Sequence, residues 1–133
     1  MTSASFLLDT DWVIHHFYKV ERISARIELA KVQGIALSVV SLAELWDGVH
    51  HGKKPALAEQ QLRQFLTSVD LLGITPEICE RFGRLRGSLR SQGQPIPHFD
   101  ILIACTALEY DLTLLSNNIK HFGAIQGLKL ESL

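Results

Sequence analysis

The stretch "FLLDTDWVI", residues 6 to 14, combines a strand pattern with two acids. Its apolar run ends at Asp9, a second acid follows at Asp11, and the chain then turns apolar again. Burying a carboxylate is costly unless the group is paired or bound to a metal ion. Two acids where a buried strand ends therefore indicate a metal or phosphoryl site at this point of the chain.

Four more short apolar stretches predict strands, within residues 35–40, 69–74, 112–116 and 128–131. Helical patterns separate them, over residues 11–18, 21–33, 42–51, 56–68, 76–92 and 101–110. Strands that alternate with helices form a parallel sheet, and continuous apolar strands are buried on both faces. The pattern therefore predicts an α/β fold with helices on both faces of the sheet, as one domain over residues 1–133.

The composition indicates where such a protein would work. The formal net charge is −1, so any attraction to nucleic acid must come from a local patch. Cys79 and Cys105 have no zinc-type spacing and are interpreted as reduced, partly buried thiols. No segment approaches the roughly 20 apolar residues of a membrane span, and no leader pattern is visible. We therefore expect a soluble cytoplasmic protein.

Acids and amides recur where the predicted strands end. Asp9 ends the first strand, Glu44 follows the second by about one helical turn, and Asp100 opens an apolar helix. Asn117 and Asn118 follow the fourth strand. Ligand sites of open α/β sheets lie outside the carboxyl ends of the strands. Hard cations such as Mg²⁺ or Mn²⁺ take oxygen ligands of this kind, and such a site can activate water for phosphodiester cleavage.

Each of these residues also has an ordinary structural interpretation. Asp9 fits the N-cap of the helix that starts near Asp11, and Asp100 fits the N-cap of the next apolar helix. Ser41 and Glu44 match a capping box, which is the favoured interpretation of Glu44 taken alone. The two asparagines are ordinary loop residues. The hypothesis of a site depends on all of them meeting at one edge of the sheet.

The order of four segments resembles the PIN domain, and more closely the VapC-type toxins of type II toxin–antitoxin systems. These segments are "LLDTDWVI" (7–14), "LSVVSLAELWDGV" (37–49), "GQPIPHFDILIACTALEYDLTLLSNNIKHF" (93–122) and "IQGLKLE" (125–131). Together they extend the resemblance over essentially the whole chain. The resemblance implies a Mg²⁺- or Mn²⁺-dependent endoribonuclease with a three-layer α/β/α fold around a central parallel sheet.

The resemblance also implies roles for individual residues. Asp9, Glu44 and Asp100 match the three core acids of the family, as catalytic residues and metal ligands. Asn118 matches a fourth catalytic position that is often Asp, so this chain carries one negative charge fewer there and a second metal ion is expected to bind more weakly. Residues expected to support the site are Asp11, Ser116 and Asn117.

The resemblance further implies three partners: an RNA substrate, a small cognate antitoxin and a second copy of the chain in a homodimer. Four arginines flank the apolar stripe of the helix predicted over 76–92. Two of them, Arg86 and Arg90, are candidates for contact with RNA phosphates, although an ordinary solvated helix carries the same pattern. His98 is interpreted as a structural residue.

Other functions remain open on the sequence alone. "DTDWV" also fits D-x-D-x-[TV], the motif of haloacid-dehalogenase-type phosphatases, in which Asp9 would be the nucleophile and Asp11 the acid/base. The end of the later strand in "SNN" disfavours that class, which needs an acid there. Two further alternatives are an inactive PIN-like binding module and a PIN nuclease of RNA processing that has no antitoxin.

Overall fold

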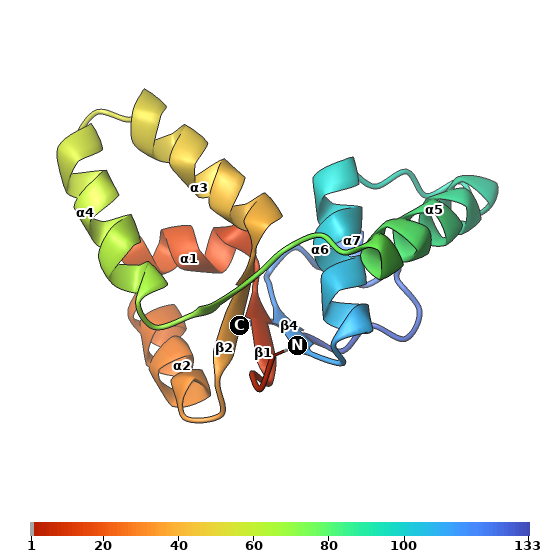
Figure 1. Ribbon diagram of the computed structural model, residues 1–133, viewed down its shortest axis with the longest axis horizontal. Helices are drawn as coiled ribbons and strands as arrows, with labels where there is room; N and C mark the ends of the chain where they lie inside the picture. Colours follow the sequence, from red (N-terminus) through yellow and green to blue (C-terminus); the bar gives the residue numbers. More distant parts are fainter. Residues whose placement is uncertain (1) are drawn as a thin grey trace.

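Five parallel strands form the central sheet in the order β3-β2-β1-β4-β5. Figure 1 labels the three central strands, β2, β1 and β4. The computed structural model describes residues 2–133. The strands are β1 (Phe6–Leu8), β2 (Ile35–Ser38), β3 (Asp70–Leu72), β4 (Thr113–Leu115) and β5 (Leu130–Glu131). All five strand predictions are confirmed, and so is their parallel arrangement.

Helices cover both faces of this sheet and complete three α/β/α layers. One side carries α1 (Thr10–Phe17), α2 (Glu21–Lys31), α3 (Val39–His51) and α4 (Pro55–Leu66). The other side carries α5 (Pro76–Ser91), α6 (His98–Glu109) and α7 (Ile119–Phe122). The predicted fold class is confirmed. The short α7 was not predicted, because four residues are too few to show helical periodicity.

The alternation of side chains along β1 explains why the strand is apolar throughout. Leu7 packs into the core beneath α5 and α6, whereas Phe6 and Leu8 pack beneath α1 to α4. Leu8 pairs in register with Leu37 of β2 and Leu115 of β4. Residues that follow these positions therefore emerge together at the carboxyl edge of the sheet.

The capping box predicted for Ser41 and Glu44 is wrong. Helix α3 begins at Val39 and is capped by Ser38, whose hydroxyl accepts a 3.1 Å hydrogen bond from Val40 N. Ser41 consequently lies inside the helix, with its side chain buried, and does not form a capping box with Glu44. Ser38 is the cap because β2 ends there, so the chain is still extended at that residue.

The start of α6 and the state of one cysteine also differ from expectation. The N-cap of α6 is Pro97, so Asp100 lies in the first helical turn and is not itself the cap. Cys105 is buried on α6 as predicted, and burial raises the pKa of its thiol to about 11. Cys79 is exposed, since it lies on the outer face of α5.

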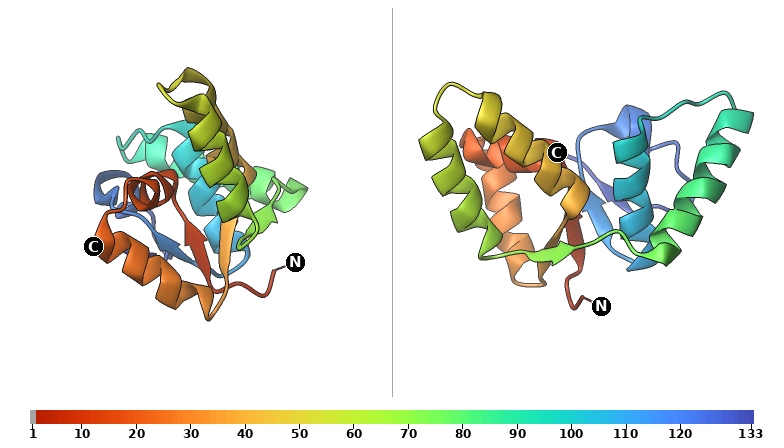
Figure 2. Two further views of the ribbon diagram at one scale, coloured as in Figure 1. Left: turned by 90° about the vertical axis from the view of Figure 1, so that its left-hand side faces the viewer. Right: turned by 45° about the horizontal axis from the view of Figure 1, so that its top comes forward.

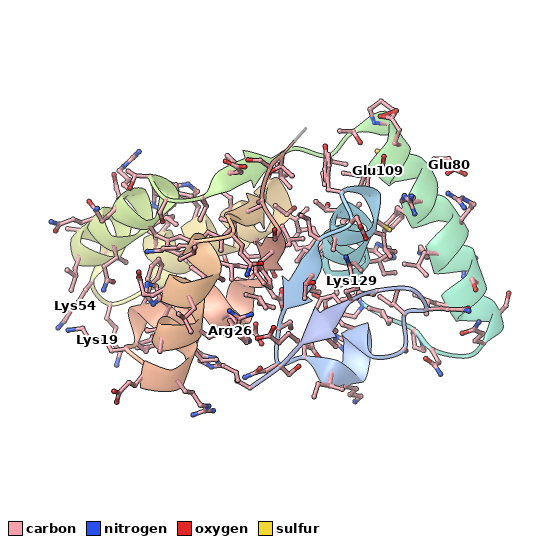
Figure 3. All side chains as sticks on the ribbon, turned by 90° about the horizontal axis from the view of Figure 1, so that it is seen from below. Lys19, Arg26, Lys54, Glu80, Glu109 and Lys129 are labelled. Carbon is pink, nitrogen blue, oxygen red and sulfur yellow. The ribbon has the colours of Figure 1, made fainter. Side chains whose placement is uncertain are left out.

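Helix α5 agrees with its sequence pattern. Thr75 caps it by accepting a 3.2 Å hydrogen bond from Ile78 N, and Pro76 occupies the first turn. Arg81 forms an ion pair with Glu109 of α6, and Arg84 forms one with Glu80; Figure 3 labels both acids. No helix within residues 2–133 combines the length and apolar character needed to cross a membrane.

Above the carboxyl edge of the sheet the two helical layers diverge. Helices α3 and α4 lean to one side and α5 with α6 to the other, which gives the V shape in the right-hand view of Figure 2. Glu44 lies in the first half of α3, and Asp100 lies in the first turn of α6. The fold therefore places these two acids on opposite sides of the same edge.

Candidate active site

Asp9 lies at the carboxyl end of β1 and is only 6% exposed. Its Oδ1 accepts a 2.9 Å hydrogen bond from Thr10 N, which caps α1. Its Oδ2 accepts a 2.7 Å hydrogen bond from the Ser116 hydroxyl at the end of β4. The N-cap interpretation of Asp9 is thus confirmed, and the second oxygen faces the neighbouring strand end, where the site was predicted.

Burial raises the pKa of Asp9 from its ordinary value of 3.8 to about 7. The hydrogen bond from Ser116 opposes this shift, and the nearby charges of Asp11 and Asp100 reinforce it. A buried carboxylate with two acidic neighbours makes the carboxyl edge of the sheet locally negative. Such an arrangement favours a bound cation, because a cation offsets both the burial and the repulsion.

Asp11 is a second acid at this edge whose carboxylate is not fully satisfied by hydrogen bonds. Its Oδ2 accepts a 3.2 Å hydrogen bond from Asn117 N. Its Oδ1 is buried and has no hydrogen-bond partner among the residues that the structure describes. A buried carboxylate oxygen without a partner is unfavourable, so this atom has the chemistry of a ligand to a water molecule or a cation.

Asn117 connects three parts of the chain. Its Oδ1 accepts a 3.0 Å hydrogen bond from Trp12 Nε1 and a 2.9 Å hydrogen bond from Leu133 N. Trp12 is fully buried, so its N–H needs such an acceptor. Asn117 therefore supports the site indirectly, because it joins α1, the loop after β4 and the C-terminal residues to one another.

Glu44 is held through Thr10, a residue that the sequence analysis did not single out. The Thr10 hydroxyl donates a 2.7 Å hydrogen bond to Glu44 Oε1. This contact joins the first turn of α1 to the first half of α3, next to Asp9. The neighbouring residues Asp9 and Thr10 thus bind two different partners, Ser116 and Glu44.

Asp100 forms a second cluster with two residues that follow β4. Asp100 Oδ2 lies 2.6 Å from His121 Nδ1 and 3.4 Å from Asn118 Nδ2. Asn118 Nδ2 also lies 2.9 Å from His121 Nδ1, so this ring nitrogen faces both a carboxylate and an amide donor, and the tautomer of His121 decides which of the two contacts is a hydrogen bond. Asn118 N also donates a 3.0 Å hydrogen bond to the Ser116 hydroxyl. His121 was missed, since its position depends on α7; its spacing of three residues from Asn118 was the one available signal.

An open hollow of about 900 Å³ lies between the two arms of the V. Glu44, Asp100 and His121 line one part of it, and the segment 95–99 lines the rest. Arg86 borders this region because its Nε donates a 2.9 Å hydrogen bond to His98 Nε2. Arg90 is exposed on the last turn of α5.

The acids are gathered at one edge, but their side chains do not form a closed cage. Within residues 2–133 no three His, Cys, Asp or Glu side chains are arranged so that they could hold a metal ion as they stand. Two of the predicted ligands have other partners, since Glu44 binds Thr10 and Asp100 binds His121. These two side chains would have to turn toward Asp9 to share one cation.

Comparison with known proteins shows which chains this one resembles. The model of the PIN domain family matches residues 6–127. Ribonuclease VapC2 of Rickettsia felis is 38% identical over 104 residues, 78% of each chain. The tRNA(fMet)-specific endonuclease VapC of Shigella flexneri is 30% identical over 127 residues, 95% of this chain and 96% of that protein. In the crystal structure of VapBC2 from Rickettsia felis bound to a promoter DNA fragment, one chain superposes with a TM-score of 0.90 at 32% identity, covering 96% of this chain and 98% of that one.

Proposed function

Since the chain belongs to the PIN domain family, and within it to the VapC proteins, we propose that it is a metal-dependent endoribonuclease that acts as the toxin of a type II toxin–antitoxin module. The observation that carries this proposal is the buried carboxylate of Asp9, whose pKa is raised to about 7 beside Asp11 and Asp100. Because the chain belongs to this family, the alternative of a haloacid-dehalogenase-type phosphatase is excluded. The names of the relatives, a ribonuclease and a tRNA endonuclease, support RNA as the substrate.

The acids fit a divalent cation by their chemistry. Asp9, Glu44 and Asp100 would hold Mg²⁺ or Mn²⁺, and the buried Asp11 Oδ1 without a partner is a further oxygen donor. When bound, such a cation stabilises negative charge on the phosphate and lowers the pKa of the water that attacks it. Asn118 supplies a neutral amide where a fourth acid would add charge, so we expect one ion to dominate.

The remaining residues orient these acids. Ser116 fixes one oxygen of Asp9, and Asn118 N fixes the Ser116 hydroxyl in turn. Thr10 holds Glu44 toward the same edge. Asp9 is therefore already oriented, whereas Glu44 and Asp100 must turn away from Thr10 and His121 when a shared cation binds.

The partners of the protein follow from its relatives. In the VapBC complexes from Rickettsia felis and Salmonella typhimurium, both solved with DNA, one chain superposes on this one with a TM-score of 0.90. We propose that this chain likewise binds a small cognate antitoxin and forms a homodimer. A nuclease of RNA processing would lack the antitoxin, and an inactive module would bind Mn²⁺ poorly in a calorimetric titration.

The direct test is cleavage of RNA by the purified protein. We expect cleavage with Mg²⁺ or Mn²⁺, none with excess EDTA, and none from Asp9→Ala. Expression without an antitoxin should arrest bacterial growth, and Asp9→Ala should relieve the arrest. Cleavage that persists in excess EDTA would contradict the metal mechanism, and normal growth with folded wild-type protein would contradict the role as a toxin.

A further inference from the structure

Phe99 is an exposed aromatic residue directly beside a proposed catalytic acid. Its side chain is 51% exposed, although it precedes Asp100 in the first turn of α6 and lines the same hollow. Other large hydrophobic side chains are exposed as well, among them Val32 and Ile119, but of these exposed residues Phe99 is the one that lines the hollow beside Asp100. A ring held in the open next to the reacting groups has the chemistry of a stacking surface.

His98, on the other side of Phe99 from the acid, is held in one orientation. Its Nε2 accepts a hydrogen bond from Arg86 Nε, and the Phe82 ring packs edge-on against it, with ring centroids 5.7 Å apart. A guanidinium group only donates, so Nε2 carries the lone pair and Nδ1 carries the proton. His98 therefore offers a fixed N–H donor beside the hollow.

Arg86 supplies a positive charge that no acid neutralises. Arg81 and Arg84 on the same helix are paired with Glu109 and Glu80. None of the ion pairs found among residues 2–133 includes Arg86, whose partner is a histidine nitrogen. A polyanion that approaches the proposed catalytic acids is repelled by them, so a free cation at the margin of the hollow assists its binding.

The segment that carries these residues is stiff. Pro95 and Pro97 each have a restricted φ, and Ile96 between them is 8% exposed and packs into the core. A ligand that binds against this wall loses little free energy in ordering it.

From these contacts, and resting on the function proposed above, we infer that Phe99, His98 and Arg86 form a subsite for one nucleotide of single-stranded RNA. The base stacks on the Phe99 ring, while Arg86 and His98 bind a neighbouring phosphate. Single-stranded RNA fits because its bases are unpaired and can stack on aromatic side chains. The bases of a duplex are paired and stacked on one another, so they are not available for this contact. The mixture of one ring with two phosphate donors favours RNA over an apolar peptide.

The test measures RNA binding in EDTA, where cleavage is stopped and affinity is separated from catalysis. The probe is a fluorescein-labelled RNA of mixed sequence, about 10 nucleotides long, used as a single strand and as a duplex. We expect tighter binding of the single strand. Phe99→Ala and Phe99→Leu should weaken its binding about tenfold, the loss expected for one base–aromatic stack, while Phe99→Trp should preserve it. Tyr18→Ala is the matched control, since Tyr18 is an 80% exposed aromatic residue at the end of α1.

The variants at Arg86 and Phe99 also define the results that would overturn the inference. Arg86→Gln should reduce the dependence of log affinity on log salt by about one phosphate contact. Unchanged RNA affinity in Phe99→Ala would overturn the subsite and indicate that the exposed ring contacts a protein partner instead. Full RNA affinity in Phe99→Leu would show that the base does not stack on the ring. Wild-type cleavage with Mg²⁺ is measured in parallel: if it succeeds while the Phe99 variants behave as wild type, only the subsite fails. A wild-type protein that neither binds nor cleaves RNA would remove both proposals.

Discussion

The Ser116 hydroxyl donates a 2.7 Å hydrogen bond to Asp9 Oδ2 and joins the carboxyl ends of β4 and β1. Ser116 is itself fixed by β5, because its N donates to Glu131 O at 3.1 Å and its carbonyl accepts from Ser132 Oγ at 2.5 Å. The Glu131 side chain is paired with Arg26 of α2, which Figure 3 labels. The C-terminal strand thus helps to orient the buried acid, although it contributes no proposed catalytic residue.

Asp9→Asn should remove a pH dependence from the stability of the metal-free protein. Folding raises the pKa of Asp9 from 3.8 to about 7, so the folded state holds this proton more tightly than the unfolded state. The resulting stabilisation is fully present below about pH 4 and is lost as the pH rises to about 7. In EDTA, the Tm of the wild type should therefore fall between about pH 4 and pH 7 more steeply than that of Asp9→Asn.

Glu77→Gln is the control for this measurement, since Glu77 is an exposed acid in the first turn of α5. It should melt with the pH dependence of the wild type. Equal slopes for Asp9→Asn and the wild type would show that Asp9 does not titrate in this range. Added Mn²⁺ should raise the Tm of the wild type at about pH 8 and leave Asp9→Asn nearly unchanged.

Asn118→Asp should strengthen the binding of Mn²⁺ and weaken the metal-free fold. The Asn118 amide nitrogen lies 3.4 Å from Asp100 Oδ2, so an acid here adds a negative charge beside another. The gain in binding is on the order of 1 kcal/mol or more, because the position is partly exposed. Calorimetry measures the affinity, and Gln33→Glu, an added charge beyond α2 at the far end of the sheet, is the control. Unchanged or weaker Mn²⁺ binding would mean that Asn118 lies away from the ion.

The fold and the proposed acids were predictable from the sequence because they depend on simple regularities. Continuous apolar strands require burial on both faces, and parallel strands align their carboxyl ends. Asp9 and Ser116 follow strand residues that pair in register, Leu8 with Leu115, so their meeting at one edge follows from the topology.

The partners of these acids were not predictable, because they depend on tertiary packing. The contact between Thr10 and Glu44 requires the angle between α1 and α3, and that between His121 and Asp100 requires the unpredicted helix α7. The capping box at Ser41 failed for a different reason. Both Ser38 and Ser41 could have capped the helix, and Ser38 does so because β2 ends there and the backbone is still extended at that residue.

Asn117→Ala should destabilise the protein by about 1–3 kcal/mol, because it leaves the buried Trp12 N–H without its acceptor. The N–H of Leu133 loses the same acceptor, although it is exposed and can bind water. Urea unfolding measures the loss. In a Trp12→Phe background the same substitution should cost much less, since no indole N–H remains to be satisfied. If Asn117→Ala lowered the free energy of unfolding equally in both backgrounds, the loss would not come from the hydrogen bond to Trp12.

Glu44→Gln separates a role in cleavage from a role in folding. The glutamine carbonyl can still accept the hydrogen bond from the Thr10 hydroxyl, so the metal-free Tm should hold, or rise slightly as one negative charge leaves the edge of the sheet. Cleavage at saturating Mg²⁺ should fall on the order of 10²-fold or more, because a charge that offsets the cation and the transition state is lost. Ser41→Ala is the matched control on the same helix. The Ser41 hydroxyl has no partner among the described residues, so its removal should leave both the Tm and the cleavage rate near those of the wild type. Full cleavage by Glu44→Gln would reduce this residue to a link between α3 and α1 and leave Asp9 and Asp100 without their third acid.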